Sequence, residues 1–236
     1  MLLTRYMSFP RFVCALKDGL FVPSPLLFDD RWEGLMPFHS LVSDELALDR
    51  QDYRRFAQWM YVSCWHDQPH ESFPMWKIYG QAREAVMIQT TSDKLEKLFK
   101  AQYPNTLTYF GAVSYENPSH GAKISLPNMA PLSKRPCDVA GGEWFPYMLF
   151  MFIKHITYNY EHEVRAVMLD AEFRPDHANP KKGIALDFRT IPNFIERLTV
   201  APGVDEWFFQ TVKETAARFA VPCEVSRSTL EAPEGA

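Results

Sequence analysis

Two glutamates and an arginine alternate near position 160, and this spacing makes the stretch the first candidate for chemistry. Glu161, Glu163 and Arg165 would share one face of a β-strand, because side chains alternate between faces along a strand. Two carboxylates on one face repel each other, which raises at least one pKa and suits the pair to acid–base work or to stabilising a cation. In the alternative interpretation Arg165 neutralises Glu163 in an ion-pair ladder, and the sequence favours neither.

A second candidate group combines a small hydroxyl with large aromatic rings. On a β-strand, Ser63 and Trp65 share one face and Cys64 takes the other. A serine hydroxyl can hydrogen-bond to a ribose or an amide, and the rings of Trp65, Trp76 and Tyr79 can stack on a flat base. The alternative is that both tryptophans belong to the core and that Ser63 is merely small. A nucleophilic serine is not expected, because no Gly-x-Ser-x-Gly turn is present.

Arg5 is the third candidate. It lies on a predicted first strand, where Arg5 and Tyr6 point to opposite faces. An arginine beside a pocket can hold a phosphate through two parallel hydrogen bonds. In the alternative interpretation Arg5 pairs with a carboxylate at the edge of the sheet.

Metal-binding patterns in this sequence are poor, and we predict no metal site. His66 and His70 are four residues apart, but Pro69 disrupts the helix that would align them as ligands. The four cysteines form no Cys-x-x-Cys pair, which argues against a zinc knuckle or a disulfide scaffold. The carboxylates of the stretch from Asp29 to Glu33 are a poor cluster for a divalent ion, so a nuclease-like activity is a lesser alternative.

Helices and strands interleave irregularly along the chain, which predicts an α+β fold. We expect a single globular domain over residues 1–236, with a curved, mostly antiparallel sheet, continuous or split, flanked by helices. Strands are predicted at Leu2–Met7, Tyr61–Trp65, Ala85–Gln89, Thr106–Tyr115, Glu163–Leu169, Gly183–Phe188, Arg197–Val200 and Cys223–Ser226, and helices at Phe9–Lys17, Asp44–Met60, Met75–Tyr79, Asp93–Ala101 and Asp205–Phe219.

Charge and hydropathy exclude several classes of protein. The chain has 25 basic and 29 acidic residues and a net charge of −4, which argues against a broad nucleic-acid or anionic-membrane surface. Its most apolar run, Trp144–Ile153, is broken by Pro146 and is half the length of about 20 residues that a membrane span needs. With no signal peptide expected either, we predict a cytoplasmic protein with a long proline-rich loop at 116–142 and a frayed tail at 231–236.

Taken in order, these motifs resemble a bacterial family known as domain of unknown function 2971. The resemblance spans most of the chain, except that the second motif departs from the Asn-Asp-Pro-Phe-Glu pattern of the family, which leaves substrate choice open. The matching motifs are Arg5-Tyr6, Phe28–Gly34, Val62–Trp65, Met75–Tyr79 and Glu161–Arg165.

The order of an arginine, a serine and a Glu-x-Glu pair on successive strands is also similar to that of Arg–Ser–Glu ADP-ribosyltransferases. This resemblance implies that NAD is the substrate, that Arg5 holds its diphosphate or ribose and that Ser63 braces the nicotinamide ribose. Glu163 would stabilise the oxocarbenium-like charge as nicotinamide leaves, and Glu161 would orient the acceptor. The aromatic residues expected to contact or stack on NAD are Tyr6, Trp65, Trp76 and Tyr79.

A protein or nucleic-acid acceptor and a role as a toxin or phage-defence effector would follow from such an activity. The oligomeric state is left open. The competing interpretation is a non-catalytic nucleotide- or protein-binding module of the same fold. The two differ in whether Arg5, Ser63 and Glu163 converge on one cleft.

Overall fold

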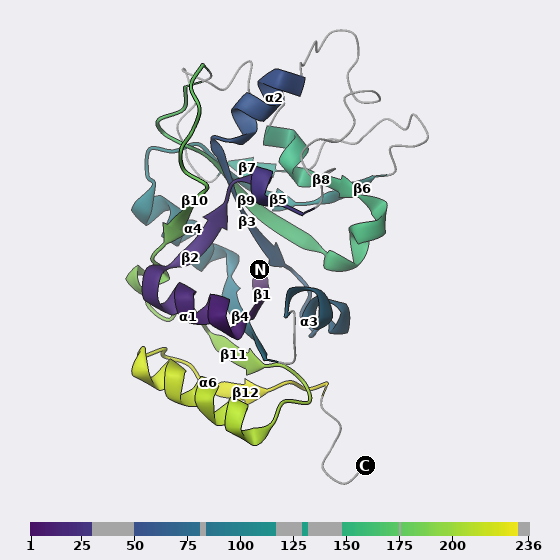
Figure 1. The fold of residues 1–236 in the computed structure, drawn as a ribbon, viewed down its shortest axis with the longest axis vertical. Coiled ribbons are helices and arrows are strands. Elements are labelled where there is room, and N and C mark those ends of the chain that lie inside the picture. Colours follow the sequence, from purple (N-terminus) through teal and green to yellow (C-terminus); the bar gives the residue numbers. More distant parts are fainter. Residues whose placement is uncertain (30–49, 81–83, 117–128, 132–147, 175, 231–236) are drawn as a thin grey trace. The chain divides into compact units, whose positions relative to one another are not determined.

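The computed structural model describes residues 1–29, 50–80, 84–116, 129–131, 148–174 and 176–230. The chain forms two compact units and passes between them repeatedly. Unit 1 contains Met1–Leu20, Trp65–Leu98 and Ala185–Ala236, and unit 2 contains Phe21–Cys64 and Phe99–Ile184. Helices and strands interleave irregularly along the described chain (Figure 1).

The described strands and helices have the following bounds. The strands are β1 Leu2–Ser8, β2 Leu20–Pro23, β3 Met60–His66, β4 Ala85–Thr91, β5 Thr108–Ala112, β6 Ser114–Glu116, β7 Met129–Pro131, β8 Ile153–His155, β9 Glu163–Leu169, β10 Gly183–Leu186, β11 Arg197–Val200 and β12 Val225–Arg227. The α-helices are α1 Phe9–Asp18, α2 Arg50–Ala57, α3 Phe73–Tyr79, α4 Ser92–Gln102 and α6 Glu206–Arg218, and the 3-10 helices are η1 Pro25–Leu27, η3 Phe150–Phe152, η4 Ile156–Glu161 and η5 Phe188–Thr190.

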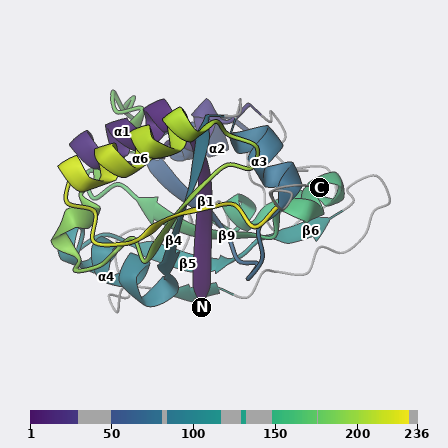
Figure 2. The ribbon, with the colours of Figure 1, turned by 90° about the horizontal axis from the view of Figure 1, so that it is seen from below.

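Unit 1 is built around β1, whose full length pairs with β4. The pairing is antiparallel and runs from Leu2 opposite Thr91 to Ser8 opposite Ala85. Beyond β4 come β11, also antiparallel, and β12, which is parallel to β11. Helices α1 and α6 lie side by side in this unit (Figure 2), and the ring of Phe9 meets that of Phe208 edge-on with centroids 5.3 Å apart.

In unit 2 the neighbouring strands follow the order β3-β9-β5-β7. Strand β5 is antiparallel to both β9 and β7. One face of β3 and β9 packs Met60, Val62, Val167 and Leu169 into a core that also contains the run Phe150–Ile153. Glu163 and Arg165 have the same parity as Val167 along β9, so the side chains of this face change from apolar to charged at the start of the strand.

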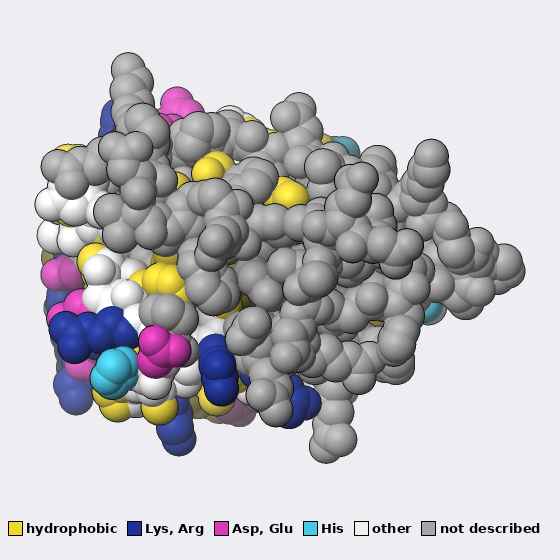
Figure 3. All heavy atoms as spheres, turned by 90° about the horizontal axis from the view of Figure 1, so that it is seen from above, with side chains coloured by type: hydrophobic (Ala, Val, Ile, Leu, Met, Phe, Trp, Pro, Cys, Tyr) yellow, Lys and Arg dark blue, Asp and Glu magenta, His cyan; other side chains and the backbone are white. Residues whose placement is uncertain are grey.

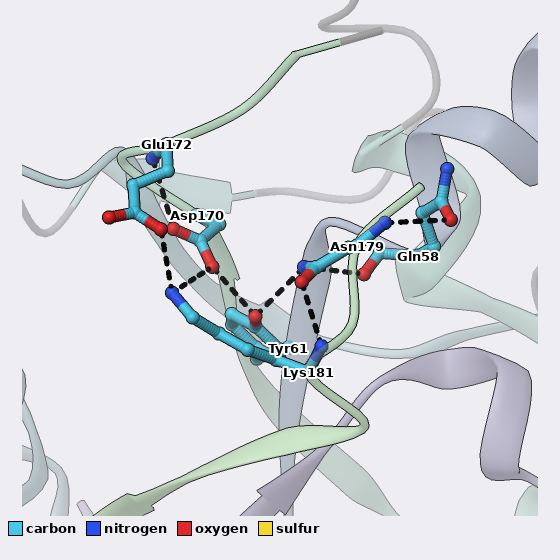
Figure 4. A network of polar contacts seen from close by, with 6 residues as sticks. All are labelled: Gln58, Tyr61, Asp170, Glu172, Asn179 and Lys181. Carbon is cyan, nitrogen blue, oxygen red and sulfur yellow. Dashed lines mark hydrogen bonds and ion pairs between the residues drawn. The ribbon is translucent and has the colours of Figure 1, made fainter. Parts of the chain in front are cut away.

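A polar network fixes the chain that follows β9 to the start of β3 (Figure 4). The hydroxyl of Tyr61 donates to Asp170 at 2.7 Å and accepts from the amide of Asn179 at 3.0 Å. Lys181 reaches Asp170 at 3.2 Å and Glu172 at 3.0 Å. Burial raises the pKa of Tyr61 to about 12, so its hydroxyl stays protonated and can donate. The network holds the start of β3 and the segment after β9 together.

The structure confirms the α+β fold and the mostly antiparallel sheet with flanking helices. It also confirms the helix after β1, which begins after Ser8 and stops at Gly19. Gly19 has a φ of 97°, in the left-handed region, and a Cβ there would lie 2.7 Å from the carbonyl oxygen of Leu186. The single domain over 1–236 stays a prediction.

Two predicted helices are wrong in detail. Helix α2 ends at Ala57 and Met60 already begins β3, because the backbone turns at Trp59, whose N–H bonds to the carbonyl of Phe56. Helix α6 ends before Phe219, which is 37% exposed. The third buried side chain of α6 is Ala216, since a helical period of 3.6 leads from Phe208 and Val212 to position 216.

The predicted loop 116–142 is also wrong in part, because Glu116 ends β6 and Met129–Pro131 forms β7 on the edge of β5. The rest of that segment, the predicted tail 231–236 and the motif positions 30–34 lie outside the described residues. Within the apolar run Trp144–Ile153, the residues Met148–Ile153 are buried.

On the face drawn in Figure 3, acidic and basic side chains of the described residues lie next to one another, in keeping with a net charge of only −4. No helix in the described part of the chain is long and apolar enough to cross a membrane. The cytoplasmic location stays a prediction.

Replacing Tyr61 with Phe should lower the free energy of unfolding by about 1–3 kcal/mol, because Asp170 and Asn179 each lose a buried hydrogen-bond partner. Urea unfolding followed by circular dichroism measures the change. Lys181→Met is the matched control, since it removes a half-exposed ion pair of the same network, with a cost of at most about 1 kcal/mol. Equal losses in both variants would show that Tyr61 does not anchor the network.

Candidate functional site

The predicted Glu163 and Arg165 lie together at the start of β9 as a buried ion pair. Glu163 is 6% exposed and Arg165 is fully buried. The guanidinium donates to one carboxylate oxygen of Glu163 through Nε at 2.8 Å and also through Nη2. Its Nη1 donates to the carbonyl oxygen of Met151 at 2.6 Å, and the ring of Phe28 lies 5.8 Å from its central carbon. The structure therefore contains the ion pair between Glu163 and Arg165 that the alternative interpretation expects.

A second buried pair lies beside the first. Lys154 is 4% exposed, and its Nζ lies 2.5 Å from Oε2 of Glu161 and 3.9 Å from Oε2 of Glu163. The same ammonium lies 4.7 Å from the centre of the Tyr158 ring, within range of a cation–π interaction. Two carboxylates and two cations thus form one buried, electrically neutral group. We call Lys154, Glu161, Glu163 and Arg165 the charged cluster.

The backbone around Glu161 differs from the predicted strand. Glu161 ends η4, and His162 adopts a left-handed conformation with φ of 40° before β9 begins at Glu163. A left-handed residue other than glycine is unfavourable, so packing must hold this turn in place. Strand alternation therefore does not relate Glu161 to Glu163, although Lys154 contacts both.

The short strands β6 and β8 lie side by side (Figure 1), and β8 carries Lys154 of the charged cluster. The two strands are parallel and place Tyr115 opposite Lys154. The hydroxyl of Tyr115 accepts a hydrogen bond of 2.8 Å from the backbone N–H of Glu163. Burial raises the pKa of Tyr115 well above its ordinary value, so the group remains neutral.

The charged cluster keeps the Glu163 carboxyl ionised. Burial alone would raise the pKa of Glu163, but the charges of Arg165 and Lys154, with hydrogen bonds from Arg165 and Cys64, hold it below its ordinary value. The repulsion expected from the sequence is therefore offset by cations. Chemically, the site offers an ionised carboxylate, fixed by ion pairs, in a medium of low dielectric constant.

Ser63 lies on the opposite face of the sheet from Glu163. Cys64 hydrogen-bonds to the Glu163 carboxylate, so the side chains of Cys64 and Glu163 share a face. Neighbouring side chains on β3 alternate, which directs Ser63, 1% exposed, to the other face. Within unit 2 the structure thus brings Glu161 and Glu163 together and leaves Ser63 apart from them.

The predicted NAD contacts Arg5, Tyr6, Trp65, Trp76 and Tyr79 all belong to unit 1. The central carbon of the Arg5 guanidinium lies 5.8 Å from the ring centre of Trp65, and the Tyr6 ring meets that of Trp76 edge-on at 4.9 Å. Trp65 and Trp76 are 2% and 4% exposed, as their core interpretation requires. Tyr79 is partly exposed. The convergence of Arg5 with Glu163 stays a prediction.

A group of hydrogen bonds around Glu71 holds Tyr6 and Trp76 in place. The hydroxyl of Tyr6 accepts from the N–H of Ser72 at 2.9 Å, and Trp76 Nε1 donates to Glu71 at 3.0 Å. The Glu71 carboxylate also accepts from the Ser228 hydroxyl at 2.5 Å and from the N–H of Thr229 at 2.7 Å. Burial raises the pKa of Tyr6 to about 12.

Sequence reasoning missed Lys154, Tyr115 and Cys64 as parts of the site. Lys154 carries one signal, since it directly follows the apolar run that ends at Ile153 and a lysine there is rarely buried without a partner. Tyr115 carries none, because its role depends on the pairing of β6 with β8. Metal ligands do not gather either, since no group of three or more His, Cys, Asp or Glu side chains within the described ranges could hold an ion.

Comparison with known proteins supports part of the family resemblance. The model of a protein family of unknown function, DUF2971, matches residues 75–166. This range contains the motifs Met75–Tyr79 and Glu161–Arg165 and the whole charged cluster, so the resemblance is confirmed there. The motifs at Arg5-Tyr6, Phe28–Gly34 and Val62–Trp65 lie outside the match. No curated protein matches the chain.

Two solved structures of DarT from Thermus sp. 2.9 are similar in fold. The complex with carba-NAD+ is 7% identical with a TM-score of 0.40, and the complex with NAD+ is 8% identical with a TM-score of 0.41. Each comparison covers 96% of this chain and 94% of the other. At this level of similarity, function has to be argued from the residues of this chain.

Replacing Arg165 with Met should lower the free energy of unfolding by about 3–5 kcal/mol, because Glu163 is left buried without its main partner. The folded-state pKa of Glu163 lies below its ordinary value, so the stabilisation is complete above about pH 4.3 and disappears as pH falls through the folded-state pKa. Urea unfolding across pH measures this.

The exposed Arg218→Met is the control and should change stability by no more than about 0.5 kcal/mol. The double variant Glu163→Gln with Arg165→Met should lose less than the sum of the single changes, because neither charge is left alone. Additive losses would contradict the pairing.

Proposed function

We propose that this chain binds NAD, breaks the bond between nicotinamide and ribose, and transfers ADP-ribose to a macromolecular acceptor. The observation that supports the proposal is the state of Glu163, a carboxylate that is buried and yet kept charged by Arg165 and Lys154. The resemblance in the order of Arg5, Ser63 and Glu163 first suggested this chemistry. The match of residues 75–166 to a family of unknown function neither assigns nor excludes it.

A fixed carboxylate suits the charge changes of this reaction. When the glycosidic C–N bond breaks, its electron pair goes to the ring nitrogen, and the cationic nicotinamide leaves as a neutral molecule. Positive charge then develops on the ribose, shared between C1 and the ring oxygen, and Glu163 would stabilise it electrostatically. A group that is already ionised and held by two donors needs no proton loss or reorganisation at that moment.

Glu161 would act on the acceptor. As the acceptor oxygen or nitrogen forms its bond to C1 of the ribose, it loses a proton, which Glu161 can accept and pass on to water. The contacts of Lys154 with both carboxylates support this second role for Glu161 beside Glu163. In glycoside hydrolysis, too, two neighbouring carboxyl groups have different roles.

The other residues predicted to contact NAD do not all keep their roles in the proposal. Arg5 remains the proposed ligand of the diphosphate, and the partly exposed Tyr79 is a better stacking surface than the buried Trp65 or Trp76. Ser63 faces away from Glu163, so we leave it out of the proposed catalytic pair. The acceptor class, a protein or a nucleic acid, and a role in defence are further parts of the proposal.

A specific observation favours a second candidate function, a binding module without turnover. The hydrogen bonds of Arg165 to Glu163 at 2.8 Å and to the Met151 carbonyl at 2.6 Å are short enough for the pair to serve equally as a structural element. In that case NAD or another nucleotide could bind and remain intact.

Replacing Glu163 with Gln decides between the two candidates. The variant keeps shape and removes the charge, so if Glu163 is catalytic, nicotinamide release from NAD should fall by about 100-fold or more at similar NAD affinity. Released nicotinamide is measured by chromatography and NAD affinity by calorimetry, while a thermal melt reports the folded fraction. Glu214→Gln, at an exposed carboxylate of α6, is the control and should keep full activity.

Retained turnover per folded molecule in Glu163→Gln would show that the carboxylate is structural. NAD binding without release in the unchanged protein would support the module. No binding at millimolar NAD would reject the transferase and favour a module that binds another nucleotide or a protein.

A further inference from the structure

We propose that Lys154 is a positioning residue that allows Glu161 and Glu163 to share one buried site as two charged carboxylates. The chemical consequence rests on the proposed function, whereas the arrangement itself rests on the geometry of unit 2. Lys154 would contact neither NAD nor the acceptor in this role. It would act through the two glutamates.

The position of the ammonium is the first argument. Nζ lies 2.5 Å from Glu161 and 3.9 Å from Glu163, and the Tyr158 ring covers it at 4.7 Å. A lysine ammonium is a compact point charge with three donors, so one group can serve two carboxylates and an aromatic face. The planar fork of Arg165 instead directs two donors at the single carboxylate of Glu163.

The balance of charge is the second argument. Titratable and charged groups face the two carboxylates from several elements: Cys64 on β3, Tyr115 on β6, Lys154 on β8, Tyr158 and Tyr160 on η4, and Arg165 on β9. Lys154 and Arg165 supply the positive charge. If Lys154 were neutral, the two buried carboxylates would lose one of the two cations that contact them from the described strands β8 and β9, and such a pair tends to retain a proton.

The third argument is that a paired β-strand fixes the position of Lys154. Lys154 is the middle residue of β8. Its partner in register is Tyr115, whose hydroxyl accepts a hydrogen bond from the backbone N–H of Glu163. The ammonium and the start of β9 are therefore tied to the same pair of strands. The left-handed turn at His162 ends η4 before β9, and Glu161 at the end of η4 contacts the same ammonium. Such an arrangement is pre-organised and does not depend on a mobile side chain.

The arrangement has a consequence for the proposed reaction. A proton shared between Glu161 and Glu163 would weaken the charge facing the ribose cation and occupy the base that should receive the acceptor proton. Lys154 therefore sets the lowest pH at which both carboxylates are charged. A neutral residue at 154 should raise the pKa of Glu163, because the charge of Lys154 helps to lower it in the folded chain.

The test compares Lys154→Met with Lys154→Arg, using the exposed Lys97→Met on α4 as the control. The first readout is the pH dependence of nicotinamide release, with kcat and KM for NAD determined separately. The second is the titration of the Glu161 and Glu163 carboxyl carbons by 13C NMR, assigned with Glu161→Gln and Glu163→Gln. The second readout requires no turnover.

For Lys154→Met we expect the acid limb of kcat to move up by about one pH unit or more, with KM for NAD little changed. The Glu163 carboxyl should titrate at a correspondingly higher pH. Lys154→Arg should return both readouts most of the way to those of the unchanged protein, and Lys97→Met should not move either. If Lys154→Met does not fold, Lys154→Met with Glu161→Gln should fold, because the unpaired charge is removed with its partner.

Unchanged carboxyl titrations in Lys154→Met would overturn the proposal, as would a failure of Lys154→Arg to restore them. A double variant that remains unfolded would also contradict it, because charge pairing would not be the reason for Lys154. If the unchanged protein releases no nicotinamide at any pH, the proposed function fails. The carboxyl titrations still decide the role of Lys154.

Discussion

The buried ion pair between Glu163 and Arg165 is the interaction on which the rest of this region depends. Arg165 is fully buried and Glu163 nearly so, and taking two such charges out of water is costly unless their geometry and further hydrogen bonds compensate. The carbonyl of Met151 and the thiol of Cys64 supply such hydrogen bonds. The segment leading into β8 and the end of β3 must therefore stay where the pair needs them.

The same face of β3 and β9 serves two purposes along its length. On this face, Val62 of β3 and Val167 and Leu169 of β9 pack into the core of unit 2. At the start of β9 the face carries the charged cluster instead. A dry, close-packed surround strengthens electrostatic interactions, so the core that stabilises the unit also makes the Glu163 charge effective.

Sequence periodicity predicted the features that depend on local geometry. The alternation along Glu163–Leu169 placed Glu163 and Arg165 on one face, and the structure has both there. It also placed Glu161 on that strand, which is wrong, because the left-handed turn at His162 ends η4 just before β9. The position of Lys154 after the apolar run indicates a buried, partnered lysine, but the identity of its partners depends on the pairing of β6 with β8, which the sequence does not show. Burial of Trp65 and Trp76 likewise depends on packing that a pattern of aromatic residues cannot distinguish from a ligand site.

The most direct test of this account is the ionisation of Glu163 in the unchanged protein, followed through its carboxyl carbon by 13C NMR during an acid titration. The Glu163→Gln variant identifies the signal. If Arg165 and Lys154 hold the charge as described, the signal should remain that of a carboxylate down to a pH below the ordinary glutamate pKa of about 4.3. A signal that titrates above that value would show a neutral acid at neutral or mildly acidic pH, and both the ion pair and the proposed chemistry would be contradicted.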